Sequence, residues 1–285
     1  MKRFIFALVV FFLILNAAPV QSQEKGRDDL VSVLTDLGVW YRVSETGEWV
    51  QLYSIEASQI TVGDLDDDGT DDLIGVWSNG VWVKYSSSGR WHRLTTSLPI
   101  SIASGDMNGD GTDDLLGSWG SGVYYRNSRT GYWVKLYGIS ARLVTTGDMD
   151  GDGADDLIGV WSNGAWVKYS SVGSWYWLST EQPLDIASGD MNRDGWDDYL
   201  ESREFGVHCR DSASGEWEMY GTEIHYQATD IATGDIDGDG ADDLLGIWVG
   251  LLDGVWVRYS YPAFSQWEQF LTESYPKCIA AGNME

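Results

Sequence analysis

The sequence of 285 residues has few cysteines, few basic residues and no recognisable catalytic motif. Two cysteines, Cys209 and Cys278, exclude a disulfide-rich scaffold. Lys and Arg number 18 against 44 Asp and Glu, which gives a net charge of −26. Nucleic acids and anionic membranes are therefore poor partners, because like charges repel, and cations are the natural ones. Three histidines lie far apart, and no nucleophile elbow, His-Glu-x-x-His pair or phosphate loop occurs. We therefore predict that the protein is not an enzyme.

Long apolar runs are also missing, with one exception at the N-terminus. Lys2 and Arg3 precede the apolar run 4–15, and the small residues Val20 and Ser22 stand where a signal peptidase reads its site. We predict a signal peptide over residues 1–22; an uncleaved membrane anchor is the alternative, although the run is short for a span. The domain over 23–285 is then secreted, extracellular or periplasmic, with no membrane span in its mature form.

An internal repeat dominates the rest of the chain. The segment Gly-Asp-x-Asp-x-Asp-Gly-x-Asp-Asp that begins at Gly63 returns, with Asn for the second Asp in two copies, at intervals of 42, 42, 42 and 45 residues. This period is that of a four-stranded propeller blade. In one repeat, short β-rich runs at 60–62, 73–77, 81–85 and 91–94 are separated by turns such as Asn-Gly and Ser-Gly. No helical period occurs, so the fold is predicted to be all-β.

The two ends of the domain complete one another. Residues 26–30 align with 69–73, where a second strand starts, and residues 278–283 align with 101–106, a first strand. We therefore predict a single β-propeller domain of six four-stranded blades, closed by one blade shared between the termini (26–57 and 277–285). The other blades start near 58, 100, 142, 184 and 229. Closure of this kind leaves no open sheet edge. A fragment of a seven- or eight-bladed parent is the alternative.

Each Asp-rich loop places oxygen-bearing side chains at positions 1, 3, 5 and 9, a Gly at position 6 and a backbone carbonyl at position 7. Carboxylate and carbonyl oxygens are the ligands that Ca²⁺ prefers, so we predict about five calcium sites. An EF-hand is excluded, because position 12 of the first loop is Gly75 and β-type residues flank the loop. The expected ligands are Asp64, Asp66, Asp68, Thr70 and Asp72; Asp106, Asn108, Asp110, Thr112 and Asp114; Asp148, Asp150, Asp152, Ala154 and Asp156; Asp190, Asn192, Asp194, Trp196 and Asp198; Asp235, Asp237, Asp239, Ala241 and Asp243. A composite sixth loop (Asn283, Glu285 and Asp29) is expected to be empty or weak.

The repeat resembles the FG-GAP (VCBS-type) repeats of integrin α-subunit propellers, and similar loops occur in secreted bacterial proteins and fungal propeller lectins. The resemblance spans nearly the whole chain after residue 22 and implies calcium on the loops that join strands one and two. It implies no particular ligand. The Phe-Gly pair of the family name is absent, replaced by pairs such as Val62-Gly63 and Ser104-Gly105.

Sixteen tryptophans are a large excess. Six of them recur at the start of the fourth strand and are predicted to pack neighbouring blades together: Trp49, Trp91, Trp133, Trp175, Trp217 and Trp267. Trp77 with Asn79, and Trp161 with Asn163, are candidate sugar sites, since a sugar ring stacks on an indole while its hydroxyls form hydrogen bonds; core filling is the leading alternative. In the fifth blade Arg203 and His208 replace aromatic residues, which indicates either drift or a specialised site.

Together these patterns predict a secreted, calcium-stabilised β-propeller binding module, carbohydrate-binding and lectin-like. The alternative is a protein-binding adhesion or structural surface module of integrin-α-like type. Expected partners are calcium and glycans or extracellular proteins. Cys209 and Cys278 fall on separate blades, so no disulfide is expected between them.

Overall fold

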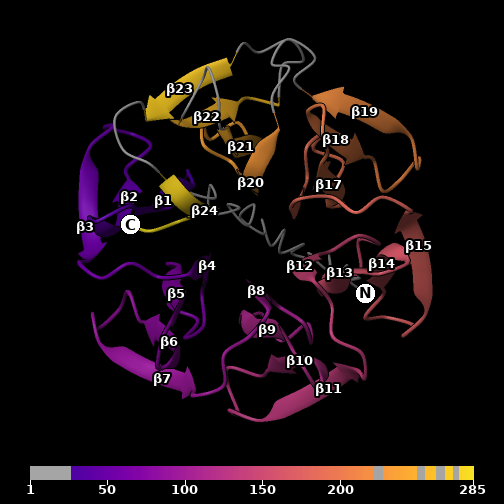
Figure 1. Ribbon diagram of the computed structural model, residues 1–285, viewed down its shortest axis with the longest axis horizontal. Coiled ribbons are helices and arrows are strands. Elements are labelled where there is room, and N and C mark those ends of the chain that lie inside the picture. Colours follow the sequence, from indigo (N-terminus) through magenta and orange to yellow (C-terminus); the bar gives the residue numbers. More distant parts are fainter. Residues whose placement is uncertain (1–26, 221–226, 249–253, 261–266, 272–275) are drawn as a thin grey trace, which may run out of the picture.

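The computed structural model describes residues 27–220, 227–248, 254–260, 267–271 and 276–285. All regular structure in these ranges is β-strand. The strands form six four-stranded antiparallel sheets arranged as blades around a central axis (Figure 1), which confirms the six-bladed propeller. Residues 1–22, for which a signal peptide was predicted, lie outside the described residues.

Each blade runs from an inner strand at the axis to an outer strand. Blade 1 consists of β24 (Pro276–Gly282), β1 (Asp29–Leu34), β2 (Gly38–Arg42) and β3 (Trp49–Tyr53); blade 2 of β4 (Gln59–Gly63), β5 (Asp72–Trp77), β6 (Gly80–Lys84) and β7 (Trp91–Thr95); blade 3 of β8 (Ser101–Gly105), β9 (Asp114–Trp119), β10 (Gly122–Arg126) and β11 (Trp133–Tyr137). Blade 4 consists of β12 (Leu143–Gly147), β13 (Asp156–Trp161), β14 (Gly164–Lys168) and β15 (Trp175–Ser179); blade 5 of β16 (Ile186–Gly189), β17 (Asp198–Ser202), β18 (Val207–Arg210) and β19 (Trp217–Tyr220); blade 6 of β20 (Ala228–Gly234), β21 (Asp243–Trp248), β22 (Gly254–Arg258) and β23 (Trp267–Leu271).

The ring closes through both termini, as predicted. The last strand, β24, pairs antiparallel with β1, so that Asp29 lies opposite Gly282 and Val31 opposite Ala280. In Figure 1 the yellow β24 lies beside the indigo β1, and β24 contacts the inner strands of blades 6 and 2 on its two sides. Closure pairs the inner edge of blade 1, which a chain without its last residues would leave open.

A Gly-x-Trp pair near the end of the second strand shapes four of the blades. The Trp77 ring folds back over Gly75, where a Cβ atom would lie 2.4 Å from the ring. No other residue fits beneath the indole, because atoms at that distance overlap. The same close approach recurs at Gly117 with Trp119, Gly159 with Trp161, and Gly246 with Trp248.

The tryptophans that start the fourth strands lie where they were predicted, at the first residue of β3, β7, β11, β15, β19 and β23. Trp91 packs edge-on against Trp77 of its own blade, at 5.3 Å between ring centroids, and against Tyr53 of blade 1 at 4.7 Å. Tyr137, Trp161 and Trp175 repeat this cluster between blades 3 and 4. The predicted role in packing neighbouring blades is confirmed at both places.

The two cysteines lie on separate blades, as predicted. Cys209 lies on β18, the third strand of blade 5, and Cys278 on β24, the inner strand of blade 1. Both are free thiols.

Candidate metal loops and inter-blade pockets

The loop between β4 and β5 is closed by the carboxylate at its first position. The two oxygens of Asp64 accept hydrogen bonds from the backbone N–H groups of Asp68 (3.1 Å) and Gly69 (2.8 Å). Gly69 adopts a φ of 89°, the left-handed region that favours glycine. Within the same turn, the Asp68 carboxylate accepts the N–H of Thr70 at 2.8 Å. Thus the Asp and Gly positions of the repeat form a tight turn even before any cation is considered.

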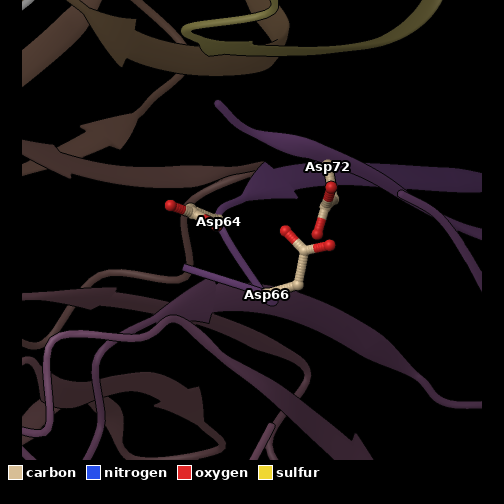
Figure 2. Close-up of side chains that lie close together, drawn as sticks. All are labelled: Asp64, Asp66 and Asp72. Atoms are coloured by element: carbon tan, nitrogen blue, oxygen red, sulfur yellow. The ribbon is translucent and has the colours of Figure 1, made fainter. Parts of the chain in front are cut away.

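Three loops gather carboxylates closely enough to share one ion. In blade 2, oxygens of Asp64, Asp66 and Asp72 lie within 4.8 Å of one another. Figure 2 shows the carboxylates of Asp66 and Asp72 facing each other. The equivalent trio in blade 4 is Asp148, Asp150 and Asp156, and blade 6 gathers Asp235, Asp237 and Asp239.

The donor set of these trios fits a hard divalent cation. In blade 4, Oδ1 of Asp150 is buried with no hydrogen-bond partner in the described part of the chain. A buried carboxylate oxygen without a donor is costly. A cation held between the three carboxylates would supply the missing interaction.

In the loops of blades 3 and 5, neighbouring side chains reduce the repulsion among carboxylates. Position 3 is Asn in both loops. In blade 3, Asn108 donates its amide to Asp114 at 2.6 Å, and Arg129 makes ion pairs with Asp110 (3.2 Å) and with Asp67 of the blade 2 loop (3.0 Å). In blade 5, Asn192 donates to Asp211 at 2.9 Å. No trio of acidic side chains gathers in either loop as described. Amide and guanidinium donors offset part of the negative charge in these two loops.

The last carboxylate of each loop is desolvated. Burial, with repulsion from neighbouring carboxylates, raises the pKa of Asp72 to about 6, and the pKa values of Asp156 and Asp243 to about 7. Both oxygens of Asp72 also accept backbone N–H groups, from Leu65 (3.1 Å) and Ser86 (2.8 Å). A cation bound beside these groups would favour their ionised forms.

The eighth loop position has a function that the sequence analysis did not assign. In blade 3, Asp113 donates its backbone N–H to the carbonyl of Asp64 in blade 2, and its carboxylate accepts the N–H of Asp64, both at 3.0 Å. The side-chain bond recurs at Asp197, Asp242, Asp28 and Asp71. This carboxylate therefore links each loop to the preceding blade. The signal was present in the sequence as the Asp-Asp pair found in every repeat.

The composite sixth loop keeps this link across the chain termini. Asn283 donates its N–H to the Asp71 carboxylate at 2.8 Å, and Asp71 donates its own N–H to the carbonyl of Asn283 at 2.6 Å. Asp29 accepts the N–H of Ser44 at 2.8 Å, and burial together with the charge of Glu285 raises its pKa to about 6. The composite loop thus brings Asp29 and Glu285, from the two ends of the domain, near each other.

The first predicted sugar site coincides with a pocket between blades 1 and 2. A cavity of about 360 Å³ is lined by Tyr53, Ile55, Trp77, Ser78, Asn79, Trp82 and Trp91. Trp77 is 9% exposed and donates its indole N–H to the carbonyl of Ile55, so it serves mainly as the wall of the pocket. Asn79 accepts the indole N–H of Trp82 at 2.9 Å and orients that ring. At the second predicted site Trp161 is 7% exposed, and Asn163 lies in the turn between β13 and β14.

Blade 5 replaces the Gly-x-Trp pair by Glu201 and Arg203. The fully buried Glu201 accepts hydrogen bonds from Ser179 of blade 4 (3.0 Å), Tyr199 (2.9 Å) and Arg203 (2.6 Å). The Arg203 guanidinium lies 4.8 Å above the Trp217 ring. His208 lies opposite Glu201 in the strand register, and burial lowers its pKa. Both oxygens of the Glu201 carboxylate thus accept hydrogen bonds, Oε1 from Ser179 and Arg203 and Oε2 from Tyr199.

Comparison with known proteins identifies the fold. The sequence matches no protein-family model and no curated protein, so the FG-GAP resemblance stays a prediction. Among solved structures, an Agrocybe aegerita lectin that recognises non-reducing terminal N-acetylglucosamine is 14% identical, with a TM-score of 0.55 over 88% of this chain and 91% of the lectin. Nidogen, from its complex with laminin, is 11% identical, with a TM-score of 0.65 over 90% of this chain and 99% of nidogen. TolB from Acinetobacter baumannii is 11% identical, with a TM-score of 0.64 over 90% of this chain and 66% of TolB. At such identities the likeness concerns the fold alone.

Within the described ranges, no helix is long and apolar enough to cross a membrane.

Proposed function

We propose that this protein is an exported, calcium-stabilised propeller that binds carbohydrate. The observation that supports it most is the gathering of three carboxylates in the loops of blades 2, 4 and 6, with a buried oxygen of Asp150 left without a donor. Calcium would hold these loops, and the opposite ends of the blades would offer inter-blade pockets to a sugar.

Calcium binding follows from charge and geometry. The trios supply hard oxygen ligands on a preformed turn. Without a cation the carboxylates repel one another at short range, and burial raises the pKa values of Asp72 and Asp156. Affinities of about 10⁻⁴–10⁻³ M, typical of extracellular modules, would suffice outside cells. At ten times such a dissociation constant, each site would stabilise the fold by about 1.4 kcal/mol.

A melting experiment tests the calcium sites directly. The melting temperature in calcium should exceed that in chelator, and magnesium should substitute poorly because it demands a tighter octahedral site. The variant Asp150→Asn should lose part of this difference in melting temperature. The matched control Glu45→Gln, on an exposed hairpin, should lose none of it. Equal melting temperatures in calcium and in chelator would overturn the proposal.

Sugar binding is supported by the pocket between blades 1 and 2. Its walls are aromatic, and Ser78 and Asn79 at the rim provide polar groups. Aromatic rings beside hydrogen-bonding groups suit the apolar face and the hydroxyls of a pyranose. A fungal lectin of the same fold recognises N-acetylglucosamine, so this sugar is a reasonable first probe.

A glycan array tests the sugar role, run once with calcium and once with chelator. Binding to a few glycans that weakens in Trp82→Ala but not in Val172→Ala, a change at an exposed hairpin residue, would support a lectin. Silence on the array from folded protein would instead favour a protein-binding adhesion module. Export is tested separately: secreted protein should begin at Gln23.

A further inference from the structure

A groove between blades 4 and 5 differs in chemistry from the aromatic pocket between blades 1 and 2. The cavity measures about 300 Å³, and its lining includes Trp177, Ser179, Glu181, Arg203, Arg210 and Trp217. Trp177 is 50% exposed and Trp217 is 40% exposed. The sequence analysis did not single out Trp177, because its position in the fourth strand is held by Gln, Arg, Lys or Met in the other blades. Two solvent-accessible indoles and two guanidinium groups therefore line one groove.

Arg203 is held in a fixed orientation in this groove. Its Nε donates to Glu201 at 2.6 Å, and Nη2 contacts the same carboxylate. Glu201 is itself anchored by Ser179 and Tyr199. A guanidinium carries five N–H donors in a planar fork, and Nη1 makes no hydrogen bond within the described residues. The guanidinium is thus preorganised, with donors left for a ligand.

Arg210 adds a second guanidinium group to the lining of the groove. Two arginines at the same position of other blades stack on aromatic rings: Arg42 on Phe270 at 4.1 Å, and Arg258 on Tyr220 at 4.0 Å. The residue of blade 4 that corresponds to Phe270 and Tyr220 is Leu178, which has no ring to stack on. Within the described part of the chain Arg210 forms no ion pair. Glu201 neutralises Arg203, so Arg210 brings one further positive charge to the groove, where Glu181 is the acidic lining residue.

We propose that this groove binds a sugar that bears a carboxylate, such as a uronic acid. The pyranose ring would stack on Trp177 or Trp217, and its carboxylate would accept hydrogen bonds from Arg203 and Arg210. Glu181 is exposed at the groove, so solvent screens its charge. This inference rests on the proposed carbohydrate-binding function and assigns a substrate class to a second site.

The probe is methyl β-glucuronide, with methyl β-glucoside as the neutral isostere, titrated by NMR at low and high salt. The glucuronide should bind about tenfold tighter than the glucoside, because the charge-assisted contacts exist for it alone, and added salt should reduce this preference. Trp177→Ala should weaken both sugars. Arg210→Gln should weaken the glucuronide alone.

A double variant removes the ion pair between Glu201 and Arg203 without leaving either charge unpaired. Glu201→Gly with Arg203→Trp restores the Gly-x-Trp pair of blades 2, 3, 4 and 6, and should abolish the preference while the protein stays folded. Equal binding of the two sugars to the wild type, or an unchanged preference in Arg210→Gln, would overturn the inference. N-acetylglucosamine binding measured in Trp82→Ala reports on the pocket between blades 1 and 2, so failure there is distinguishable from failure here.

Discussion

Blades 2 and 5 share one backbone plan and differ in how they fill the same space. In blade 2 the Trp77 ring lies over Gly75 and packs against Trp91. In blade 5 the Arg203 guanidinium lies over Trp217 and is held by the buried Glu201. Glu201 thus takes the place of the glycine, and Arg203 takes the place of the tryptophan. The pair changes together because either substitution alone would leave a clash or an unpaired charge.

The space at the end of the second strand can therefore be filled by different pairs of residues in the same fold. The pair of Gly75 and Trp77 forms the wall of an aromatic pocket. The pair of Glu201 and Arg203 forms part of a groove with hydrogen-bond donors. Both are compatible with the same four-stranded blade. Differences in binding chemistry between blades can therefore arise without a change of fold, and the four predictions below test this from the largest effect to the smallest.

The largest effect is expected for Arg203→Ala. It leaves the fully buried Glu201 without its counter-charge, so the free energy of unfolding should fall by about 3 kcal/mol. Urea denaturation measures the loss. The double variant Glu201→Gly with Arg203→Trp should lose far less, since it adopts the blade 2 solution. If the two variants were equally unstable, the two pairs would not be interchangeable.

Gly75→Ala should be the next most destabilising change. The added Cβ would lie 2.4 Å from the Trp77 ring, and overpacking of this kind costs about 2 kcal/mol. Gly120→Ala is the matched control, because nothing lies within 4 Å of its added Cβ. In a Trp77→Leu background the cost should shrink, since blade 1 combines Ser32 with Leu34 at these positions. An equal cost in both backgrounds would mean that ring and glycine are not coupled.

Asp66→Asn should give the blade 2 loop the character of the blade 5 loop. Removal of one like charge should stabilise the calcium-free protein by less than about 1 kcal/mol, the scale of exposed charge pairs. The stabilisation gained on adding calcium should become smaller at the same time. Thermal melts with and without chelator check both signs, and a larger calcium response in the variant would contradict the assignment.

The smallest effect concerns the inner strands, where Ser101 in blade 3 accepts the N–H of Val144 and Asp185 in blade 5 accepts that of Ile231. Asp185 lies beside Asp230, and desolvation raises the pKa of Asp185 to about 6 and that of Asp230 further. The folded state therefore retains protons that the unfolded chain releases above its pKa of about 4. Stability should fall as pH rises from there through the raised values.

Asp230→Asn removes the need for that proton and should flatten this part of the pH dependence. The measurement compares melting temperatures of wild type and variant between pH 4 and pH 8, in saturating calcium so that the loops contribute little. The variant should gain relative to wild type at pH 8 and not at pH 4. A constant difference over the whole range would show that the pair does not titrate.

Much of the architecture could be read from the chain before any coordinates. The recurrence of Gly63 at nearly constant intervals predicted the blades, and the complementary ends at Asp29 and Gly282 predicted the closure. The predicted packing role of the fourth-strand tryptophans is confirmed for Trp91 and Trp175, which contact the preceding blade. The expected calcium ligands were also assigned from the repeat, and a metal-binding measurement tests them.

Other features could not be read in this way, because they depend on contacts between blades. The link from Asp113 to Asp64 joins residues of two repeats, and only their placement side by side around the ring defines it. The hydrogen bond by which Asn79 orients the Trp82 ring was likewise seen only in the structure. The sequence also did not show that Ser179, Tyr199 and Arg203 meet at the Glu201 carboxylate.

The sequence by itself determined the repeat, the number of blades and the position of every Asp-rich loop, because those features are encoded locally and repeated in register. The tertiary structure decided which loops gather three carboxylates, which indoles stay exposed and which arginine a buried carboxylate holds. These outcomes depend on the side chains that a neighbouring blade presents across the interface. Periodicity within one chain does not specify those contacts, since they form only when the ring closes.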